Sequence, residues 1–307
     1  MGTLGAAGAA EHGGDGGAAV FERNRGLLFS VAYDMLGSVA DAEDCVQDTW
    51  IRWARDDRSG VADPKSYLVR IVVNVTLNRM RGTRSRRETY VGPWLPEPLV
   101  TAPDVADRVE LADTVSFAML VVLETLAPVE RAVFVLREVF GLPHAEIAEA
   151  VGRTEAAVRQ VAHRARERVH ARRPRFPADA AEHRRLTEGF LAACADGDVD
   201  RLTAMLADDV EVVTDGGGRT RAALRPLSGA AKSARFLAAV STHYTGFRAE
   251  MTGVNGVPGI AMFDADAMPM AVAVLEARDG LITRVLVVRN PGKLQHLGPD
   301  TGRSPAQ

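Results

Sequence analysis

Apolar side chains recur at helical spacing through the first part of the chain. One such pattern runs over residues 21–36, and a second begins at Asp41. A third runs from Lys65 to about Arg81, directly after Asp63-Pro64, an N-cap residue followed by a proline that suits the first helical turn. These patterns predict three helices that bury their apolar faces against one another.

A later stretch predicts two short helices joined by a tight turn. The first covers 144–150, Gly152 provides the turn, and Thr154 is suited to cap a second helix over 155–171. The apolar positions that would face each other are Ile147, Ala148, Val158, Val161 and Ala165. The pattern predicts a helix-turn-helix, with an ordinary helical hairpin that carries a charged face as the alternative.

From residue 184 onward the periodicity changes. A helical pattern over 184–195 leads to a strand-like run at 210–213. Two further strand patterns, 271–278 and 281–289, flank Asp279-Gly280, which is a two-residue hairpin signal. Helices followed by antiparallel strands predict an α+β domain.

Proline-rich segments separate these pieces. Prolines recur over 90–103 and again over 173–177, and each one disfavours helix at and before its position. The sequence therefore predicts a multidomain fold, with two all-α domains followed by an α+β domain. The expected parts are a disordered Gly/Ala-rich tail over 1–19, a helical domain over 20–88, a linker over 89–107, a helix-turn-helix domain over 108–172, an α+β domain over 180–296 and a tail over 297–307.

Composition supports a globular protein. The 307 residues are 47% hydrophobic and 25% charged, close to globular averages. The two cysteines, Cys45 and Cys194, lie far apart with no metal-ligand spacing nearby, so neither a disulfide framework nor a metal or cofactor site is indicated. No apolar run approaches the roughly 18–20 residues that span a bilayer, and no signal peptide is evident. We expect a soluble, cytoplasmic protein that binds no membrane.

The net charge of −3 hides two basic segments. Residues 65–87 contain Lys and Arg with no Asp or Glu, and residues 153–175 contain many arginines beside Glu155 and Glu167. On the third predicted helix the polar face carries arginine and asparagine, which serve phosphates and bases, and the second helix of the helix-turn-helix turns Arg159, His163 and Arg164 outward. The segments predict two DNA-binding surfaces, with solvated helix faces as the alternative.

Three strings together resemble the bacterial extracytoplasmic-function sigma factors. They are VADAEDCVQDTWIRW (39–53), DPKSYLVRIVVNVTLNRMR (63–81) and LPHAEIAEAVGRTEAAVRQVAHRARERV (142–169). The remainder resembles the sigma-J-like subgroup with a fused C-terminal SnoaL-like domain, through WLPEP at 94–98, a DGGGK-like string at 215–219 and an NPDK-like string at 290–293. Arg219 replaces the lysine of the first tail string, and Gly292 replaces the aspartate of the second.

The resemblance implies a non-enzymatic subunit that binds RNA polymerase core and directs promoter-specific transcription initiation. The polymerase-binding residues would be Asp41, Glu43, Asp44, Asp48 and Trp50. The residues at the minus-ten element would be Lys65, Arg70, Asn74, Asn78 and Arg81. The residues at the minus-thirty-five element would be Arg153, Thr154, Glu155, Arg159, His163 and Arg164.

We further expect the C-terminal domain to regulate the other two in cis, in the role that a separate anti-sigma protein fills elsewhere, so that no separate anti-sigma protein is required. The expected contacts run from Gly217, Gly218 and Arg219 to Trp94 and Glu97, through backbone donors and charge. The full set of expected interdomain residues is Trp94, Leu95, Pro96, Glu97, Pro98, Asp215, Gly216, Gly217, Gly218, Arg219, Asn290, Pro291 and Lys293.

Three alternatives stay open at this point. The C-terminal domain offers titratable residues that could serve acid–base catalysis, namely Asp215, His243, Asp264, Asp266 and His296. It also offers aromatic residues that could line a pocket for a small ligand or form plain core, namely Phe190, Phe236, Tyr244, Phe247 and Phe263. An ordinary helix-turn-helix regulator would bind its operator without polymerase.

Overall fold

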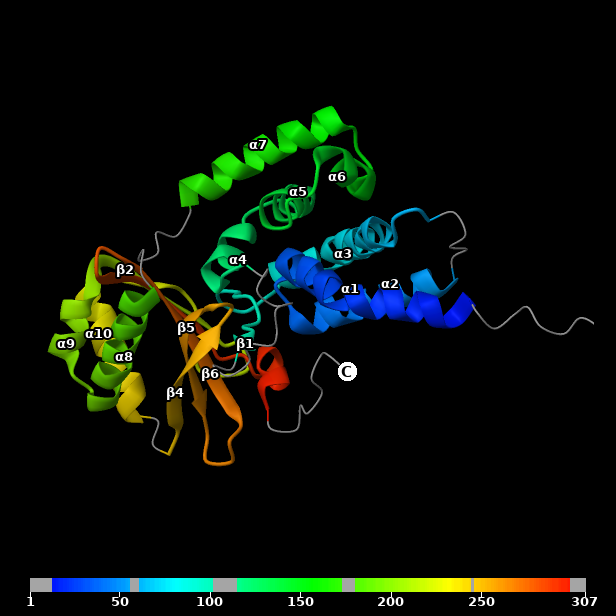
Figure 1. Ribbon diagram of the computed structural model, residues 1–307. Coiled ribbons are helices and arrows are strands. Elements are labelled where there is room, and N and C mark those ends of the chain that lie inside the picture. Colours follow the sequence, from blue (N-terminus) through cyan, green and yellow to red (C-terminus); the bar gives the residue numbers. More distant parts are fainter. Residues whose placement is uncertain (1–12, 56–60, 102–114, 173–179, 244–245, 299–307) are drawn as a thin grey trace, which may run out of the picture.

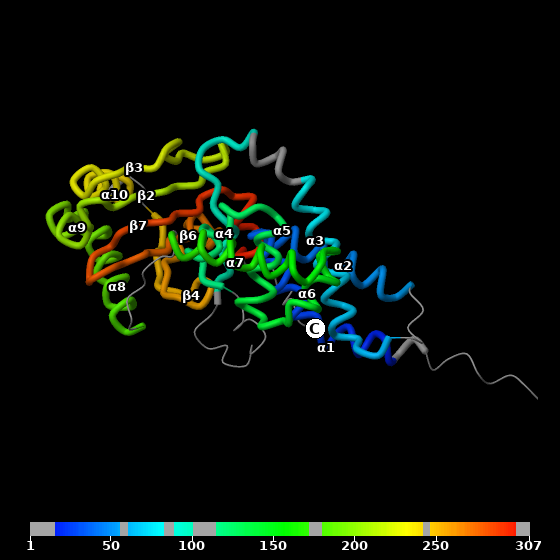
Figure 2. Tube along the Cα trace, turned by 90° about the horizontal axis from the view of Figure 1, so that it is seen from above, coloured from blue at the N-terminus to red at the C-terminus, as the bar shows by residue number. Residues whose placement is uncertain are grey.

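The structure, a computed structural model, describes residues 13–55, 61–101, 115–172, 180–243 and 246–298. Figure 1 shows helices α8, α9 and α10 on one side of a sheet and helices α1 to α7 on the other side. In Figure 2 the sheet and helices α2 and α3 lie at opposite ends of the molecule, with α4 between them. None of the helices in the described ranges is long and apolar enough to cross a membrane.

The first helical domain consists of α1 (Gly13–Leu36), α2 (Val39–Arg55) and α3 (Pro64–Glu88). The expected disordered tail over 1–19 is wrong for residues 13–19, because α1 already begins at Gly13. Tertiary contacts hold this Gly/Ala-rich turn: the Trp53 indole N–H donates to Gly17 O at 2.8 Å, and the rings of Phe21 and Trp50 lie 5.0 Å apart.

The helix-turn-helix domain follows. It contains α4 (Phe117–Leu123), α5 (Pro128–Phe134), the π-helical turn η2 (Val135–Val139), α6 (His144–Val151) and α7 (Glu155–Arg172). Gly152 ends α6 in the left-handed region, with φ +65°, and so permits the tight turn into α7. All five apolar seam positions predicted between these two helices are buried.

The C-terminal domain combines helices and a mixed sheet. Its helices are α8 (Ala180–Asp196), α9 (Val199–Met205) and α10 (Ala230–His243), followed near the end by the 3-10 turns η3 (Pro291–Lys293) and η4 (Gln295–Leu297). Its strands are β2 (Leu206–Asp215), β3 (Leu227–Ser228), β4 (Arg248–Val254), β5 (Val257–Phe263), β6 (Pro269–Arg278) and β7 (Leu281–Val288). Asp279 and Gly280 form the β6–β7 hairpin turn, as predicted, both with positive φ.

The sheet has a strand that comes from outside this domain. The strand order is β1-β4-β5-β6-β7-β2-β3, and β1 is Val100–Thr101, from the segment expected to be only a linker. It pairs antiparallel with the edge of β4, joining Val100 to Val254 and Thr101 to Gly253. The β2–β7 pairing is parallel, and the other pairings are antiparallel.

The two faces of the sheet contact different parts of the chain. Side chains alternate along each strand, so Val212 and Leu275 face the domain's own helices while Val213 and Val274 face the other side. On that other side they pack against Leu95 of the linker and Phe117 of α4. The linker and helix α4 therefore supply apolar cover for one face of the C-terminal sheet.

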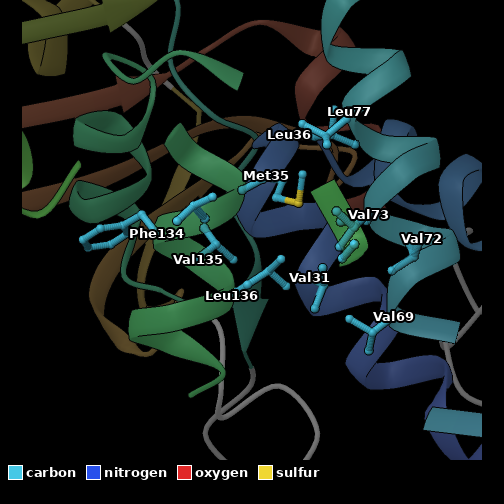
Figure 3. Packing of buried hydrophobic residues seen from close by; sticks show 14 of the residues in the cluster. Val31, Met35, Leu36, Val69, Val72, Val73, Leu77, Phe134, Val135 and Leu136 are labelled. Atoms are coloured by element: carbon cyan, nitrogen blue, oxygen red, sulfur yellow. The ribbon is translucent and has the colours of Figure 1, made fainter. Parts of the chain in front are cut away.

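The two N-terminal domains share one hydrophobic core. Figure 3 shows side chains from α1, α3 and the α5–η2 helix gathered in a single cluster. Buried Arg131 joins the domains as well, because its guanidinium donates to Met35 O at 3.0 Å and pairs with Glu124 at 2.5 Å. The predicted fold class, two all-α domains followed by an α+β domain, is confirmed.

Candidate interdomain and nucleic-acid-binding sites

A buried carboxylate ends strand β2 and receives three hydrogen bonds. Asp215 is fully buried, and its Oδ1 accepts from the Tyr90 hydroxyl at 2.6 Å. Its Oδ2 accepts from Leu95 N at 2.8 Å and from Lys293 Nζ at 2.7 Å. Two of these donors belong to the linker, so the carboxylate fixes the linker to the C-terminal domain.

Lys293 completes this arrangement from turn η3. Its ammonium donates to Leu95 O and lies 4.0 Å from the centre of the Trp94 ring, a cation–π geometry. Asn290 caps η3 and donates from Nδ2 to the Tyr90 hydroxyl at 2.7 Å. Tyr90, Leu95, Asp215, Asn290 and Lys293 are called the linker anchor below.

Tyr90 is a firm hydrogen-bond donor in the linker anchor. Burial, together with the bond to and charge of the Asp215 carboxylate, holds the pKa of Tyr90 well above its usual value, which disfavours loss of the donated proton. Lys293 balances the buried charge of Asp215 directly. A buried ion pair whose oxygens and protons are all bonded tolerates loss of either partner poorly.

Glycine is required beside the linker anchor because the linker passes very close. Gly217 has φ +58°, and a Cβ there would lie 2.3 Å from Asn290 Nδ2 and 2.8 Å from the Tyr90 hydroxyl. Gly218 has φ +69°, and its Cβ would lie 3.1 Å from Val91. The glycine string thus leaves room for the linker side chains of Tyr90 and Val91.

Glu97 was expected to contact the C-terminal domain, but it contacts the first helical domain. Its carboxylate caps helix α2, accepting from Val39 N at 2.6 Å and from the Ser38 hydroxyl at 2.8 Å, and its own N–H donates to Gly37 O. A carboxylate at a helix N-terminus also interacts favourably with the helix dipole. The expected grip of Gly217 to Arg219 on Trp94 and Glu97 is therefore corrected, since Trp94 contacts Lys293 and Glu97 contacts the first helical domain.

Buried Tyr33 joins the first helical domain to both the linker and the C-terminal domain. The Tyr33 hydroxyl of α1 donates to Glu97 O at 2.6 Å and accepts from Asn255 Nδ2 at 2.9 Å. Asn255 also exchanges hydrogen bonds with the backbone of Leu99. Sequence analysis missed Tyr33, Tyr90 and Asn255, although Asn255-Gly256 is a hairpin signal that marks the β4–β5 turn where Asn255 adopts φ +48°.

The expected minus-ten surface on α3 is partly covered by the helix-turn-helix domain. Ser66 donates to Glu146 of α6 at 3.2 Å, and Arg70 lies 3.8 Å from Glu149 of the same helix. The other expected residues, Lys65, Asn74, Asn78 and Arg81, are exposed. Asn74 donates to Arg70 O, and Asn78 accepts from Arg81, so this polar face is ordered by local bonds.

The expected minus-thirty-five surface on α7 faces solvent. All of its residues are exposed: Arg153, Thr154, Glu155, Arg159, His163 and Arg164. Thr154 caps the helix by accepting from Ala157 N at 3.3 Å, and Arg159 pairs with Glu155 one turn away at 2.5 Å. Arg166 and Arg168 pair instead with Glu138 and Glu130, which fastens α7 to its own domain.

The acidic residues of α2 are divided between internal ion pairs and solvent. Asp41 and Asp44 both pair with Arg79 of α3, at 2.7 and 2.6 Å, and Glu43 pairs with Arg25 of α1 at 3.3 Å. The remaining expected polymerase-binding residues, Asp48 and Trp50, are exposed.

The titratable residues considered for catalysis do not converge. Asp215 is bound in the linker anchor, and His296 Nε2 lies 2.8 Å from Pro98 O, where burial lowers the pKa of the ring. Asp264 accepts from backbone N–H groups of its own turn, and Asp266 is exposed. The side chain of His243 lies outside the described residues.

The C-terminal domain contains a cavity of about 580 Å³ between the sheet and helices α8 and α10. Phe190, Phe236 and Phe247 line it, as the pocket interpretation expected. Phe263 does not belong to the lining, and its ring lies beneath Arg248 at 5.3 Å. Tyr244 lies outside the described residues.

Comparison with known proteins gives matches over both helical domains and over the whole chain. Residues 20–86 match Sigma-70 region 2, and residues 116–169 match Sigma-70 region 4. The chain is 38% identical over 288 residues to the ECF RNA polymerase sigma factor SigJ of Mycobacterium tuberculosis, covering 89% of this chain and 91% of the relative. It is 36% identical over 191 residues to the probable ECF sigma factor SigI of that organism, covering 61% of this chain and 66% of the relative. The crystal structure of the M. tuberculosis SigJ protein superposes with a TM-score of 0.74 at 33% identity, covering 94% of this chain and all of that one.

Proposed function

This chain belongs to the extracytoplasmic-function RNA polymerase sigma factors, and on that premise we propose that its C-terminal domain regulates transcription in cis by holding the two DNA-binding domains together. As a sigma factor, the protein binds RNA polymerase core and directs promoter-specific initiation without catalysis of its own. The proposal concerns how that activity is restrained.

The observation that carries the proposal is the contact between the two DNA-binding domains. Minus-ten and minus-thirty-five elements are centred about 25 base pairs apart, or about 85 Å of duplex at roughly 3.4 Å per base pair. In this structure Ser66, next to Lys65 of the expected minus-ten surface, bonds to Glu146 of the helix-turn-helix domain at 3.2 Å, and Arg70 of that surface lies 3.8 Å from Glu149. A sigma factor in this arrangement cannot reach both promoter elements, so the closed form must open before initiation.

The C-terminal domain contributes to closure through the linker. The linker anchor fixes residues 90–95 to the C-terminal domain, while Glu97 fixes the next part of the linker to α2. Asn255 then joins the C-terminal domain to Tyr33 of α1 directly. Residues 90–97 of the linker are thus held by both the C-terminal domain and α2, which restrains the domains that they join.

Charge adds a second element to closure. Arg70 lies 3.8 Å from Glu149, and the neighbouring Glu146 accepts from Ser66, so carboxylates of α6 occupy space that a DNA phosphate would need. Competition of this kind is consistent with a reversible restraint. In the open form we assign the minus-ten contacts to Lys65, Arg70, Asn74, Asn78 and Arg81, and the minus-thirty-five contacts to Arg153, Thr154, Glu155, Arg159, His163 and Arg164.

Two further assignments complete the proposal. The exposed residues of α2, Asp48 and Trp50, lead the polymerase-binding surface, and Asp41, Glu43 and Asp44 join it beside their internal partners. Since the restraint lies within the chain, the protein requires no separate anti-sigma protein.

The test is run-off transcription with core polymerase and a promoter library, comparing the full chain with its Asp215→Asn and Glu146→Lys variants. We expect both variants to give more specific transcript than the full chain at equal concentration, because each weakens closure. Asp209→Asn, an exposed residue whose nearest cation, Arg278, lies 3.8 Å away, serves as the control and should transcribe like the full chain. Equal transcript from all four proteins would contradict cis regulation while leaving the sigma assignment intact.

A further inference from the structure

The cavity in the C-terminal domain has the size and lining of a small-molecule site. Its volume of about 580 Å³ lies within the range of about 300–1,000 Å³ typical of ligand pockets. Aromatic and aliphatic side chains dominate its walls, among them Phe190, Phe236, Phe247, Ile260 and Met262. Water in such a cavity is readily displaced by an apolar molecule.

Two arginines provide the charged part of the lining. Arg289 donates from Nη1 to Arg221 O at 2.8 Å, so Arg289 lies against the backbone of Arg221. Arg221 forms no ion pair with any residue in the described ranges. Guanidinium groups bind carboxylates through paired N–H donors, which gives both charge and geometry. The described lining holds no Asp, Glu or His, so it is suited to binding rather than to acid–base catalysis.

We propose that this cavity binds a small amphipathic monocarboxylate, with its apolar body among the aromatic walls and its carboxylate at Arg221 and Arg289, and that binding releases the linker. This inference rests on the proposed function for its regulatory part, while the binding site itself stands on the cavity and its arginines.

Neighbouring residues connect the cavity to the linker anchor. Thr214 lines the cavity and the next residue, Asp215, holds the linker, because successive residues of strand β2 point to opposite faces. The same relation holds for Arg289 and Asn290 at the end of β7. Arg289 N donates to Asp215 O at 2.7 Å, so displacement of Arg289 acts directly on the residue that carries the buried carboxylate.

The glycine-containing loop also connects the cavity to the linker anchor. Ala222 and Ala223 line the cavity, and Gly217 in the same loop lies against Tyr90. Ala223 N donates to the Thr214 hydroxyl at 2.7 Å, which ties the loop to β2. A carboxylate that draws Arg221 and Arg289 toward the cavity therefore moves the loop and strand end away from the linker, which favours the open population.

Linkage makes the coupling measurable in both directions. If a carboxylate favours the released linker, then a variant in which the linker is already released must bind that carboxylate more tightly, by the same factor. Decanoate is the probe, and decanol, which has the same chain without the charge, is its comparison. We expect calorimetric titration of the full chain to show saturable, one-site binding of decanoate.

Matched variants assign the binding to this cavity. Arg221→Gln should weaken decanoate binding about fivefold or more and leave decanol binding unchanged, because only decanoate uses the guanidinium. Arg225→Gln, in the same loop but outside the lining, should change neither by more than about twofold. Ala249→Leu, which fills the cavity from β4, should remove binding of both. Thermal unfolding of each variant without ligand checks that it remains folded.

The outcomes separate the site from the regulation. The site would be overturned if the full chain showed no saturable binding of decanoate up to about 1 mM. It would also be overturned if Arg221→Gln and Arg225→Gln lost decanoate affinity equally. Binding that Asp215→Asn does not tighten would overturn the coupling. If decanoate binds as expected but no variant of the linker anchor alters transcription, the proposed function fails and the binding site remains.

Discussion

At the scale of single residues, the strongest constraint is the buried charge of Asp215. Its carboxylate is inaccessible to water, and Lys293, its cationic partner, is nearly so. Charges buried in this way are stable only while every partner is present, because an unpaired one has lost its hydration without compensation. The linker is part of that compensation, since Leu95 and Tyr90 provide two of the donors.

Asp215→Asn should therefore destabilise the protein. The amide cannot neutralise Lys293, so we expect a loss of about 3 kcal/mol in the free energy of unfolding of the C-terminal domain. Urea denaturation followed by circular dichroism measures it. Asp209→Asn is the control, because Asp209 is exposed and its nearest cation, Arg278, lies 3.8 Å away, and such surface changes cost less than about 0.5 kcal/mol. Equal effects of the two substitutions would contradict the importance of the buried pair.

Two histidines, buried His183 and half-buried His296, predict an acid sensitivity. Burial lowers the pKa of His296 and of His183 below the ordinary value of 6.5. The unfolded chain then binds more protons than the folded chain just below that pH, so stability is complete above about pH 6.5 and is lost as pH falls through the lowered values. We expect the melting temperature to fall between about pH 7 and pH 5, and His296→Gln to flatten that fall.

His170→Gln provides the comparison for this titration. His170 is exposed, so its substitution should leave the slope of melting temperature against pH unchanged. A slope that responds equally to His170→Gln and His296→Gln would refute the assignment to the buried ring.

At the scale of elements, the linker behaves as part of the C-terminal sheet. It supplies the edge strand β1, fills one sheet face with Leu95 and passes through a space that glycine keeps open. The sequence showed the prolines and the WLPEP string, but two residues of strand are too few for a periodic signal. The N-terminal turn of α1 was not predicted for a related reason. Its stability comes from a contact with Trp53, far away in sequence, rather than from its own glycines.

Gly217→Ala should loosen the linker without unfolding the helices. The added Cβ meets Asn290 and Tyr90 at distances that no relaxed contact allows, and its positive φ adds about 1 kcal/mol of strain. We expect limited proteolysis to cleave the linker several times faster than in the unchanged chain.

Gly256→Ala is the control that separates the effect of steric contact from the effect of backbone strain. Gly256 also has a positive φ, of +76°, but a Cβ there meets nothing within 4 Å, so it carries the backbone strain alone. Cleavage that accelerates equally in both variants would show that strain, and not the approach of the linker, is responsible.

At the scale of the whole molecule, the important property is that the two DNA-binding domains form one core. Patterns along the sequence predicted helices α1, α2 and α3 and the seam of the helix-turn-helix, because those features depend on local periodicity, whereas α4 and α10 were not predicted. They could not show that α6 lies on α3, since an apolar position looks the same whether its partner belongs to the same domain or to another. The contacts of Tyr33 with Asn255, 222 residues away, are of this kind.

Joining α3 to α6 covalently should prevent initiation. Ser66→Cys with Glu146→Cys places two reactive thiols at the contact, and the natural Cys45 and Cys194 are both buried. Treatment with a short bismaleimide should reduce specific transcript about tenfold or more, because the cross-linked chain cannot span both promoter elements.

Single-cysteine chains with either substitution, treated in the same way, control for modification of each residue. Their transcription should be close to that of the untreated chains. A cross-linked chain that still transcribes at the untreated level would show that closure is compatible with initiation.

The long sequence separation of the interdomain contacts also has a consequence during synthesis. Tyr90 bonds to Asp215, which follows it by 125 residues. Leu95 bonds to Lys293, which follows it by 198 residues. At about 5–20 residues per second, synthesis of helices α1 to α7 is complete roughly 6 to 24 s before Lys293 is added. Every newly made molecule thus passes through a stage in which both DNA-binding domains exist and the linker anchor does not. The translation rate therefore sets how long each nascent chain lacks the linker anchor.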